Sequence, residues 1–123
     1  MSLQVNIDET REVKRIVLNG SLDSNTSPLL ETKLESVLAS ATTALVFDLA
    51  GLEYISSAGL RVMFIAKKAM DAKGGKVLLV NLQPQIEKVF EIIKAIPFMS
   101  VFQSYKELDD YLTHMQRRVQ ETS

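Results

Sequence analysis

Cysteine and tryptophan are absent from this chain of 123 residues, and histidine occurs once, as His114. Without cysteine there can be no disulfide, no thiol nucleophile and no cysteine-ligated metal. A single histidine also makes a histidine-rich metal site impossible and disfavours an enzyme with a histidine base. Because 14 basic side chains nearly balance 15 acidic ones, the net charge of −1 gives no electrostatic reason to expect nucleic acid as a partner.

Long hydrophobic runs are missing as well. No stretch approaches the roughly 18 apolar residues that a membrane span needs, and the N-terminal MSLQVNIDET has neither the basic flank nor the apolar run of a signal peptide. We therefore expect a cytoplasmic protein without direct membrane insertion. The composition, 46% hydrophobic and 24% charged, is that of an ordinary globular protein. The length suits one domain over residues 1–123 with its own core.

Two hydrophobic periods alternate along the chain. Alternating or short continuous apolar segments predict strands, and apolar residues at helical spacing predict helices. The predicted strands lie at 3–7, 13–19, 44–50, 76–81 and 100–102, and the predicted helices at 28–40, 57–73 and 84–96, with a last one after Ser104. A polar loop at 20–27 is expected to end in Ser27 as a helix cap, Pro97 to end the third helix, and residues 116–123 to be frayed.

This order of elements predicts an α/β domain. Repeated strand–helix–strand units favour a mixed, mostly parallel sheet of four to five strands with about four helices packed against it. The short loop between the first two strands makes them antiparallel neighbours.

The segment from Ala44 to Arg61, ALVFDLAGLEYISSAGLR, is the most informative part of the chain. It predicts a buried strand, a short turn and a helix that begins at two serines, Ser56 and Ser57. A hydroxyl there lies beside backbone N–H groups that have no partner within the helix. Ser57 is then a helix cap, a nucleophile or a phosphoacceptor.

The nucleophile interpretation has little support. The G-x-S-x-G elbow of hydrolases lacks its first glycine here, where Ile55 stands. The sole candidate base, His114, lies on the C-terminal helix. A phosphoacceptor is compatible with the fold, because a phosphate at a helix start meets free N–H groups and the positive end of the helix dipole. We therefore expect no enzyme, no cofactor and no metal.

The predicted helix 57–73 has two sides. At 100° per residue, one side collects small and apolar residues and is expected to be buried: Ala58, Val62, Ile65, Ala66 and Ala69. The other side is mostly polar but includes Leu60 and Phe64, with Arg61, Lys67 and Lys68 around them. This pattern predicts a protein-docking patch, unless another part of the chain covers it. Gly59, inside the helix, indicates either access to the backbone or tight packing.

At this point the sequence resembles a known family. The stretch DLAGLEYISSAGLRVM, from Asp48 to Met63, is similar to the signature of STAS domains of the anti-sigma factor antagonist family, which has D-S-x-G-L after a hydrophobic strand. The loop Gly20-Ser21-Leu22-Asp23 resembles the family's G-x-L-D element. The order of elements matches from Leu3 to Leu112, which is the expected core of the domain.

The resemblance implies a function and its residues. Such antagonists bind an anti-sigma factor that is also a serine kinase; the kinase phosphorylates the motif serine and releases the antagonist, and a serine phosphatase restores it. The alignment places the acceptor at Ser57, less readily at Ser56, which stands where the family often has aspartate. Asp23 is expected in the partner surface, or as a turn residue before the first helix. Partner binding is expected from Asp23, Ser56, Leu60, Arg61 and Phe64.

One alternative function stays open, and a second is set aside. A STAS module can instead be a constitutive subunit of a larger assembly, such as a transporter component, with Ser57 only as a helix cap. Asp48, at the end of the predicted central strand, invites comparison with a phosphorylated receiver domain, but the chain lacks an acidic pair and a lysine that match those of receiver domains.

Overall fold

The computed structural model describes residues 2–9, 13–93, 100–102 and 104–122, with side chains up to residue 114 except at positions 8, 9 and 112. Five strands and four helices follow one another along these residues. They are β1 (Leu3–Glu9), β2 (Val13–Leu22), α1 (Ser27–Leu38), β3 (Ala44–Ile55), α2 (Ser57–Ala72), β4 (Lys76–Val80), α3 (Pro84–Ile92), β5 (Ser100–Phe102) and α4 (Tyr105–Thr122). This is the predicted order.

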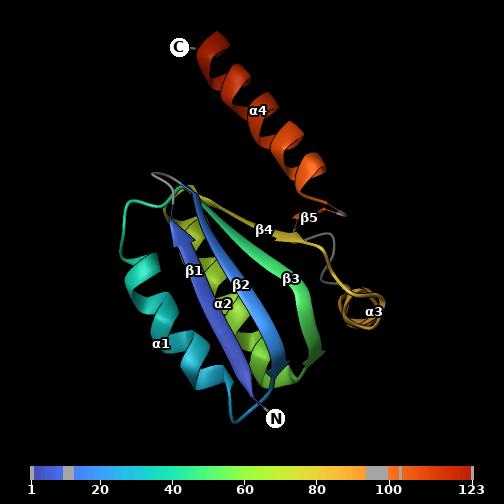
Figure 1. Ribbon diagram of the computed structural model, residues 1–123. Coiled ribbons are helices and arrows are strands. Elements are labelled where there is room, and N and C mark those ends of the chain that lie inside the picture. Colours follow the sequence, from blue (N-terminus) through green and yellow to red (C-terminus); the bar gives the residue numbers. More distant parts are fainter. Residues whose placement is uncertain (1, 10–12, 94–99, 103, 123) are drawn as a thin grey trace.

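The strands form one sheet in the order β1-β2-β3-β4-β5. β1 pairs with β2 in the antiparallel sense, and the β2–β3, β3–β4 and β4–β5 pairs are parallel. The predicted mixed, mostly parallel α/β sheet is therefore confirmed. Because parallel neighbours end at the same edge, β2 and β3 both finish at the lower end of Figure 1, where α1 and α2 begin.

The sheet has a large core on one face and a small one on the other. Along β3, Leu45 and Phe47 point into the core that α1, α2 and α3 share, whereas Val46 points to the opposite face. There it packs in a small cluster with Leu108 of α4. The alternation follows from strand geometry, in which successive side chains leave opposite faces. Figure 1 shows α1 and α2 together behind the sheet and α4 extending beyond β5.

Two strands are longer than predicted at the end where α2 begins. β2 includes residues 20–22, which we predicted as loop, and β3 continues from Ala50 to Ile55, which we predicted as a turn. Asp48 therefore lies within β3, not at its end. The additional residues pair with each other in parallel register, Leu22 opposite Ile55, across two irregularities. Polar and small residues hid this pairing, because each segment alone lacks the strand pattern.

The ends of the helices correct one prediction and support another. Thr26, not Ser27, is the N-cap of α1, and Ser27 is already helical. At α4 the expected cap is present, since the N–H of Glu107 donates to Oγ of Ser104 at 3.3 Å. α4 is helical to Thr122, and the fraying of residues 116–123 stays a prediction. Pro97 lies outside the described residues.

The length and apolar character of a helix determine whether it can cross a membrane. Among the described residues, no helix combines the length and the apolar character that crossing one takes.

Candidate functional site

The two serines at the start of α2 have different roles. Ser56 is the N-cap: its backbone is extended and its Oγ accepts a hydrogen bond from the N–H of Gly59 at 3.4 Å. Ser57 is the first helical residue and its side chain is exposed. Within the described part of the chain, the Ser57 hydroxyl has no hydrogen-bond partner. The cap role that we allowed for Ser57 thus belongs to Ser56, which leaves the Ser57 hydroxyl accessible.

The start of α2 is fixed against the end of β2. The N–H of Ser56 donates to the carbonyl of Leu22 at 2.9 Å. A Cβ at Gly59 would lie 2.6 Å from Cγ of Leu22 and 3.0 Å from its carbonyl oxygen. Since no side chain fits there, Gly59 serves tight packing, one of its two predicted roles.

Asp23 follows Leu22 directly, so the structure brings it to the same end of the domain as Ser57. Oδ1 of Asp23 accepts hydrogen bonds from the N–H groups of Asn25 and Thr26, at 2.9 and 3.0 Å. The bond from the Thr26 N–H is the main cause that holds the pKa of Asp23 below its usual value. The interpretation of Asp23 as a turn residue before α1 fits these contacts; its place in a partner surface stays a prediction.

The orientation of α2 differs from the predicted one. Leu60, which we placed on the exposed side, is only 9% exposed and packs in the core, whereas Ile65, predicted to be buried, is 39% exposed. At 100° per residue, the buried side is rotated by roughly 90° from the predicted one. The reason is that α2 contacts α1 as well as the sheet. We had taken the stripe of small residues as the buried one, but Met63 and Met70 lie in the core.

Five side chains form an exposed stripe along α2, starting at the candidate acceptor. The members are Ser57, Arg61, Phe64, Ile65 and Lys68. Phe64 is 38% exposed, as the sequence predicted. Arg61 lies one turn after Ser57 and has no ion-pair partner among the described residues. The stripe therefore joins a free hydroxyl, two cations and two apolar side chains on one helix face.

Tyr54 was missed by the sequence analysis as a candidate. It lies near the end of β3, three residues before Ser57, and its side chain is 49% exposed. The available signal was the aromatic–apolar pair Tyr54-Ile55, in which only Ile55 is buried. We had placed both in a turn and therefore assigned them no side.

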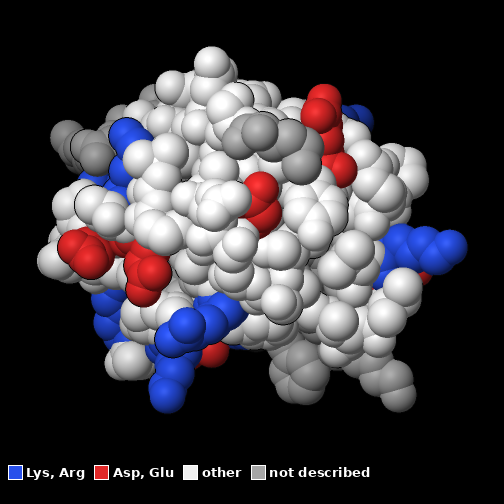
Figure 2. All heavy atoms as spheres, turned by 90° about the horizontal axis from the view of Figure 1, so that it is seen from below, with Lys and Arg blue, Asp and Glu red and all other residues white. Residues whose placement is uncertain are grey.

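Figure 2 looks onto the end of the molecule where β2 and β3 finish and α1 and α2 begin. Basic and acidic side chains lie mainly toward its rim, and its middle is largely uncharged apart from an acidic group. Such a surface suits a protein partner better than a polyanion, because a polyanion needs clustered cations.

A second group of polar side chains lies on the other face of the sheet. The buried carboxylate of Asp48 accepts hydrogen bonds from the hydroxyl of Tyr105, at 2.5 Å, and from the N–H of Ala50, at 3.0 Å. A carboxylate engaged in this way and covered by α4 does not resemble the open acceptor of a receiver domain. His114 is exposed on α4, as a polar surface residue.

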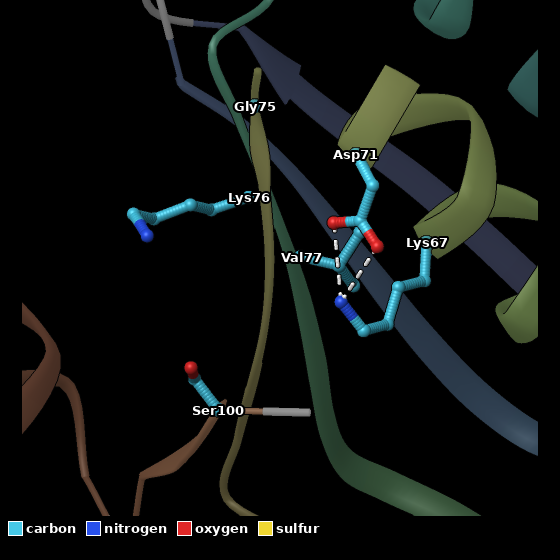
Figure 3. Close-up of a pocket in the computed structure, with 6 residues that line it drawn as sticks. All are labelled: Lys67, Asp71, Gly75, Lys76, Val77 and Ser100. Atoms are coloured by element: carbon cyan, nitrogen blue, oxygen red, sulfur yellow. Dashed lines mark hydrogen bonds and ion pairs between the residues drawn. The ribbon is translucent and has the colours of Figure 1, made fainter. Parts of the chain in front are cut away.

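A shallow recess near the end of α2 is lined by polar groups (Figure 3). Its main interaction is the ion pair between Nζ of Lys67 and the carboxylate of Asp71, at 3.0 and 3.1 Å. Lys76 points to the other side of β4 in this view. Lys67 is ten residues after Ser57, about 15 Å along the helix, so this recess is separate from the candidate site.

Comparison with known proteins identifies the family. The STAS domain model matches residues 4–108. The chain belongs to the STAS domain family. BtrV of Bordetella bronchiseptica, which is named as an anti-sigma factor antagonist, is 36% identical to this chain over 85 residues. The match covers 69% of this chain and 71% of that protein. The anti-sigma F factor antagonist of Paenibacillus polymyxa is 24% identical over 103 residues, 83% of this chain and 88% of that protein.

Solved STAS structures share the fold. The anti-sigma factor antagonist SpoIIAA in its unphosphorylated form has a TM-score of 0.76, with 23% identity over 91% of this chain and 97% of that one. The same protein from Bacillus in its phosphorylated form has a TM-score of 0.69, also at 23% identity, over 89% and 99% of the two chains. A sulfate transporter family protein from Wolinella succinogenes has a TM-score of 0.72 at 14% identity, over 85% and 88%. At these identities the likeness is one of fold.

Proposed function

We propose that this STAS domain is an anti-sigma factor antagonist that works by partner switching. In its unmodified form it binds an anti-sigma factor that is also a serine kinase, and so frees the sigma factor. Phosphorylation of Ser57 releases it, and a serine phosphatase returns it to the binding form. The protein needs no cofactor of its own, since the kinase binds the ATP.

One observation carries the proposal: the Ser57 hydroxyl is exposed at the first position of α2 and has no hydrogen-bond partner within the described residues, while its neighbour Ser56 is engaged as the cap. A kinase needs an accessible hydroxyl, and of the two serines Ser57 is the more accessible. The names of the relatives support the role, and SpoIIAA is described in phosphorylated and unphosphorylated forms.

The chemistry of the switch follows from the position of Ser57. A phosphate adds about −1.5 to −2 charges at neutral pH. At the first turn of a helix this charge meets the positive end of the dipole, so the domain stays folded. On a partner surface the same charge must be desolvated and repels acidic groups, so binding is lost. The modification thus acts on the complex and spares the fold.

The docking face in this proposal consists of Arg61 and Phe64 on the exposed stripe, with the loop at Asp23 beside the start of α2. Phe64 supplies apolar area, and Arg61 supplies a cation with no ion-pair partner among the described residues. Phenylalanine and arginine are both enriched in protein–protein interfaces. Leu60 is left out because it packs in the core.

The decisive experiment is phosphorylation by the anti-sigma factor kinase of the same organism. We expect a gain of about 80 Da, the mass of one phosphoryl group, and loss of kinase binding by the modified protein. Ser57→Ala is expected to remove the gain and to keep binding. Ser56→Ala is the matched control and should still be phosphorylated. Retention of the gain in Ser57→Ala, or equal binding by both forms, would contradict the proposal.

A constitutive scaffold subunit is the second candidate, favoured by the shared fold of the sulfate transporter family protein. In that case the domain binds its partner permanently, and a charge at Ser57 has no role. Ser57→Asp separates the two functions. Under partner switching it weakens binding, although less than a phosphate does, because one carboxylate has less charge and fewer oxygens. Under the scaffold function binding is unchanged.

A further inference from the structure

The carboxylate of Asp23 is bonded to the backbone of its own loop. Oδ1 accepts from the N–H groups of Asn25 and Thr26, and the Thr26 hydroxyl also lies 3.2 Å from it. These contacts form an Asx turn, in which a short side chain folds the backbone two residues ahead. The side chain is therefore occupied within the loop before any partner arrives.

Thr26 completes the arrangement from the other side. Its Oγ1 accepts from the N–H of Asp23 at 2.9 Å and donates to the carbonyl of Ser21 at 2.8 Å. The carbonyl of Asp23 in turn accepts from the N–H of Ser27, where α1 begins. The exit from β2 and the entry into α1 are thereby fixed to each other.

The same loop adjoins the first turn of α2, where the candidate acceptor lies. Leu22, the residue before Asp23, accepts the hydrogen bond from Ser56 and packs on Gly59. Between Asp23 and Thr26, Ser24 and Asn25 form an exposed tip. The Asx turn therefore sets where this tip lies relative to the first turn of α2.

We infer that Asp23 is a positioning residue for partner binding: it holds the tip Ser24–Asn25 near the first turn of α2 and makes no charge contact with the partner itself. This inference rests on the proposed function. It divides the docking surface into two parts, the helix face after Ser57 and a preformed loop tip. A preformed tip loses little conformational entropy on binding, which favours affinity.

Two substitutions separate shape from charge. Asp23→Asn keeps an oxygen at the same distance from the backbone, so it can accept both N–H bonds, but it has no charge. Asp23→Glu keeps the charge but adds a methylene, which moves the carboxylate out of the Asx geometry. Binding is measured by calorimetry with the purified anti-sigma factor kinase of the same organism, at two salt concentrations.

We expect Asp23→Asn to bind within about threefold of the natural protein, and Asp23→Glu to bind about tenfold or more weakly. The salt dependence of binding should be the same for Asp23→Asn and the natural protein, because no charge contact is lost. The reverse order of the two variants, or equal binding by both, would overturn the inference. Absence of binding by the natural protein would overturn the proposed function instead, before any Asp23 variant is made.

A second pair of variants and a partner-free measurement complete the test. Thr26→Ser keeps the hydroxyl and is expected to bind normally, whereas Thr26→Val removes it at nearly the same volume and should weaken binding. Hydrogen exchange of the free protein should show the amide of Thr26 protected in Asp23→Asn and fast in Asp23→Glu. Circular dichroism identifies any Asp23 variant that fails to fold. In that case the comparison of Thr26→Ser with Thr26→Val tests the inference. Normal binding by Thr26→Val would speak against the inference.

Discussion

The hydroxyl of Tyr105 donates a 2.5 Å hydrogen bond to Oδ2 of Asp48, which joins the first residue of α4 to the middle of β3. The guanidinium of Arg15 lies 4.4 Å from the centre of the Tyr105 ring. Together with the small apolar cluster around Leu108, these contacts hold α4 on the face of the sheet opposite α1 and α2.

Tyr105→Phe is expected to loosen α4 selectively. The variant keeps the ring under Arg15 but removes the bond to a buried carboxylate, at an expected cost of about 1–2 kcal/mol in the free energy of unfolding. Urea denaturation measures the total loss. Hydrogen exchange should become faster in α4 and stay slow in the central strands. Uniform acceleration in all elements would show that α4 and the sheet open together.

Phe64 and Leu60 provide a matched pair on α2. Phe64→Asp is expected to change the free energy of unfolding by less than about 1 kcal/mol, because the ring is partly solvated. Leu60→Asp places a carboxylate in the core and should cost about 3 kcal/mol or more. Under the proposed function Phe64→Asp also abolishes kinase binding. Thermal denaturation measures the stability of the two variants, and calorimetry measures kinase binding. A strong loss of stability in Phe64→Asp would refute the orientation of α2.

The ionisation of Asp23 gives a prediction for acid pH. Its pKa is below the ordinary 3.8, mainly because the Thr26 N–H bond favours the charged form. The stability that this contributes is complete above pH 3.8 and is lost as the pH falls through the lower pKa of the folded state. Titration of the Asp23 carboxyl carbon by NMR should show a midpoint below 3.8. Asp23→Asn should remove this part of the acid sensitivity, and a midpoint above 3.8 would contradict the prediction.

Gly59→Ala is expected to destabilise the domain. The added Cβ would lie 2.6 Å from Cγ of Leu22, so the first turn of α2 must shift. Overpacking of this kind costs typically about 1–3 kcal/mol, although alanine is the better helix former. Urea denaturation measures the change. Gly74→Ala is the comparison, because open space surrounds Gly74 and its positive φ of 74° alone opposes the substitution.

Much of the fold could be predicted because hydrophobic period and order of elements agree. The segment Ala44–Leu49, which is apolar apart from Asp48, indicated a strand covered on both faces, and it lies in the centre of the sheet. The continuation of β3 to Ile55 could not be predicted in this way. Its pairing partner is the end of β2, about thirty residues earlier, and only the pairing makes either segment a strand.

The candidate site was predicted in position but not in orientation. The sequence motif placed the hydroxyl of Ser57 at the start of α2, which the structure bears out. The assignment of Leu60 to the exposed side was wrong, because helical spacing gives the sides of a helix and not which neighbour covers each of them. The contact of α2 with α1 decides that question, and no local pattern in the sequence specifies it.

The close contact between Gly59 and Leu22 has a practical consequence for studies of the complex. Because no space remains on that side, the first turn of α2 has only one position. A phosphate on the Ser57 hydroxyl is therefore expected to leave that position unchanged. Rigid-body docking that starts from the free domain is therefore a sound approach for both chemical forms.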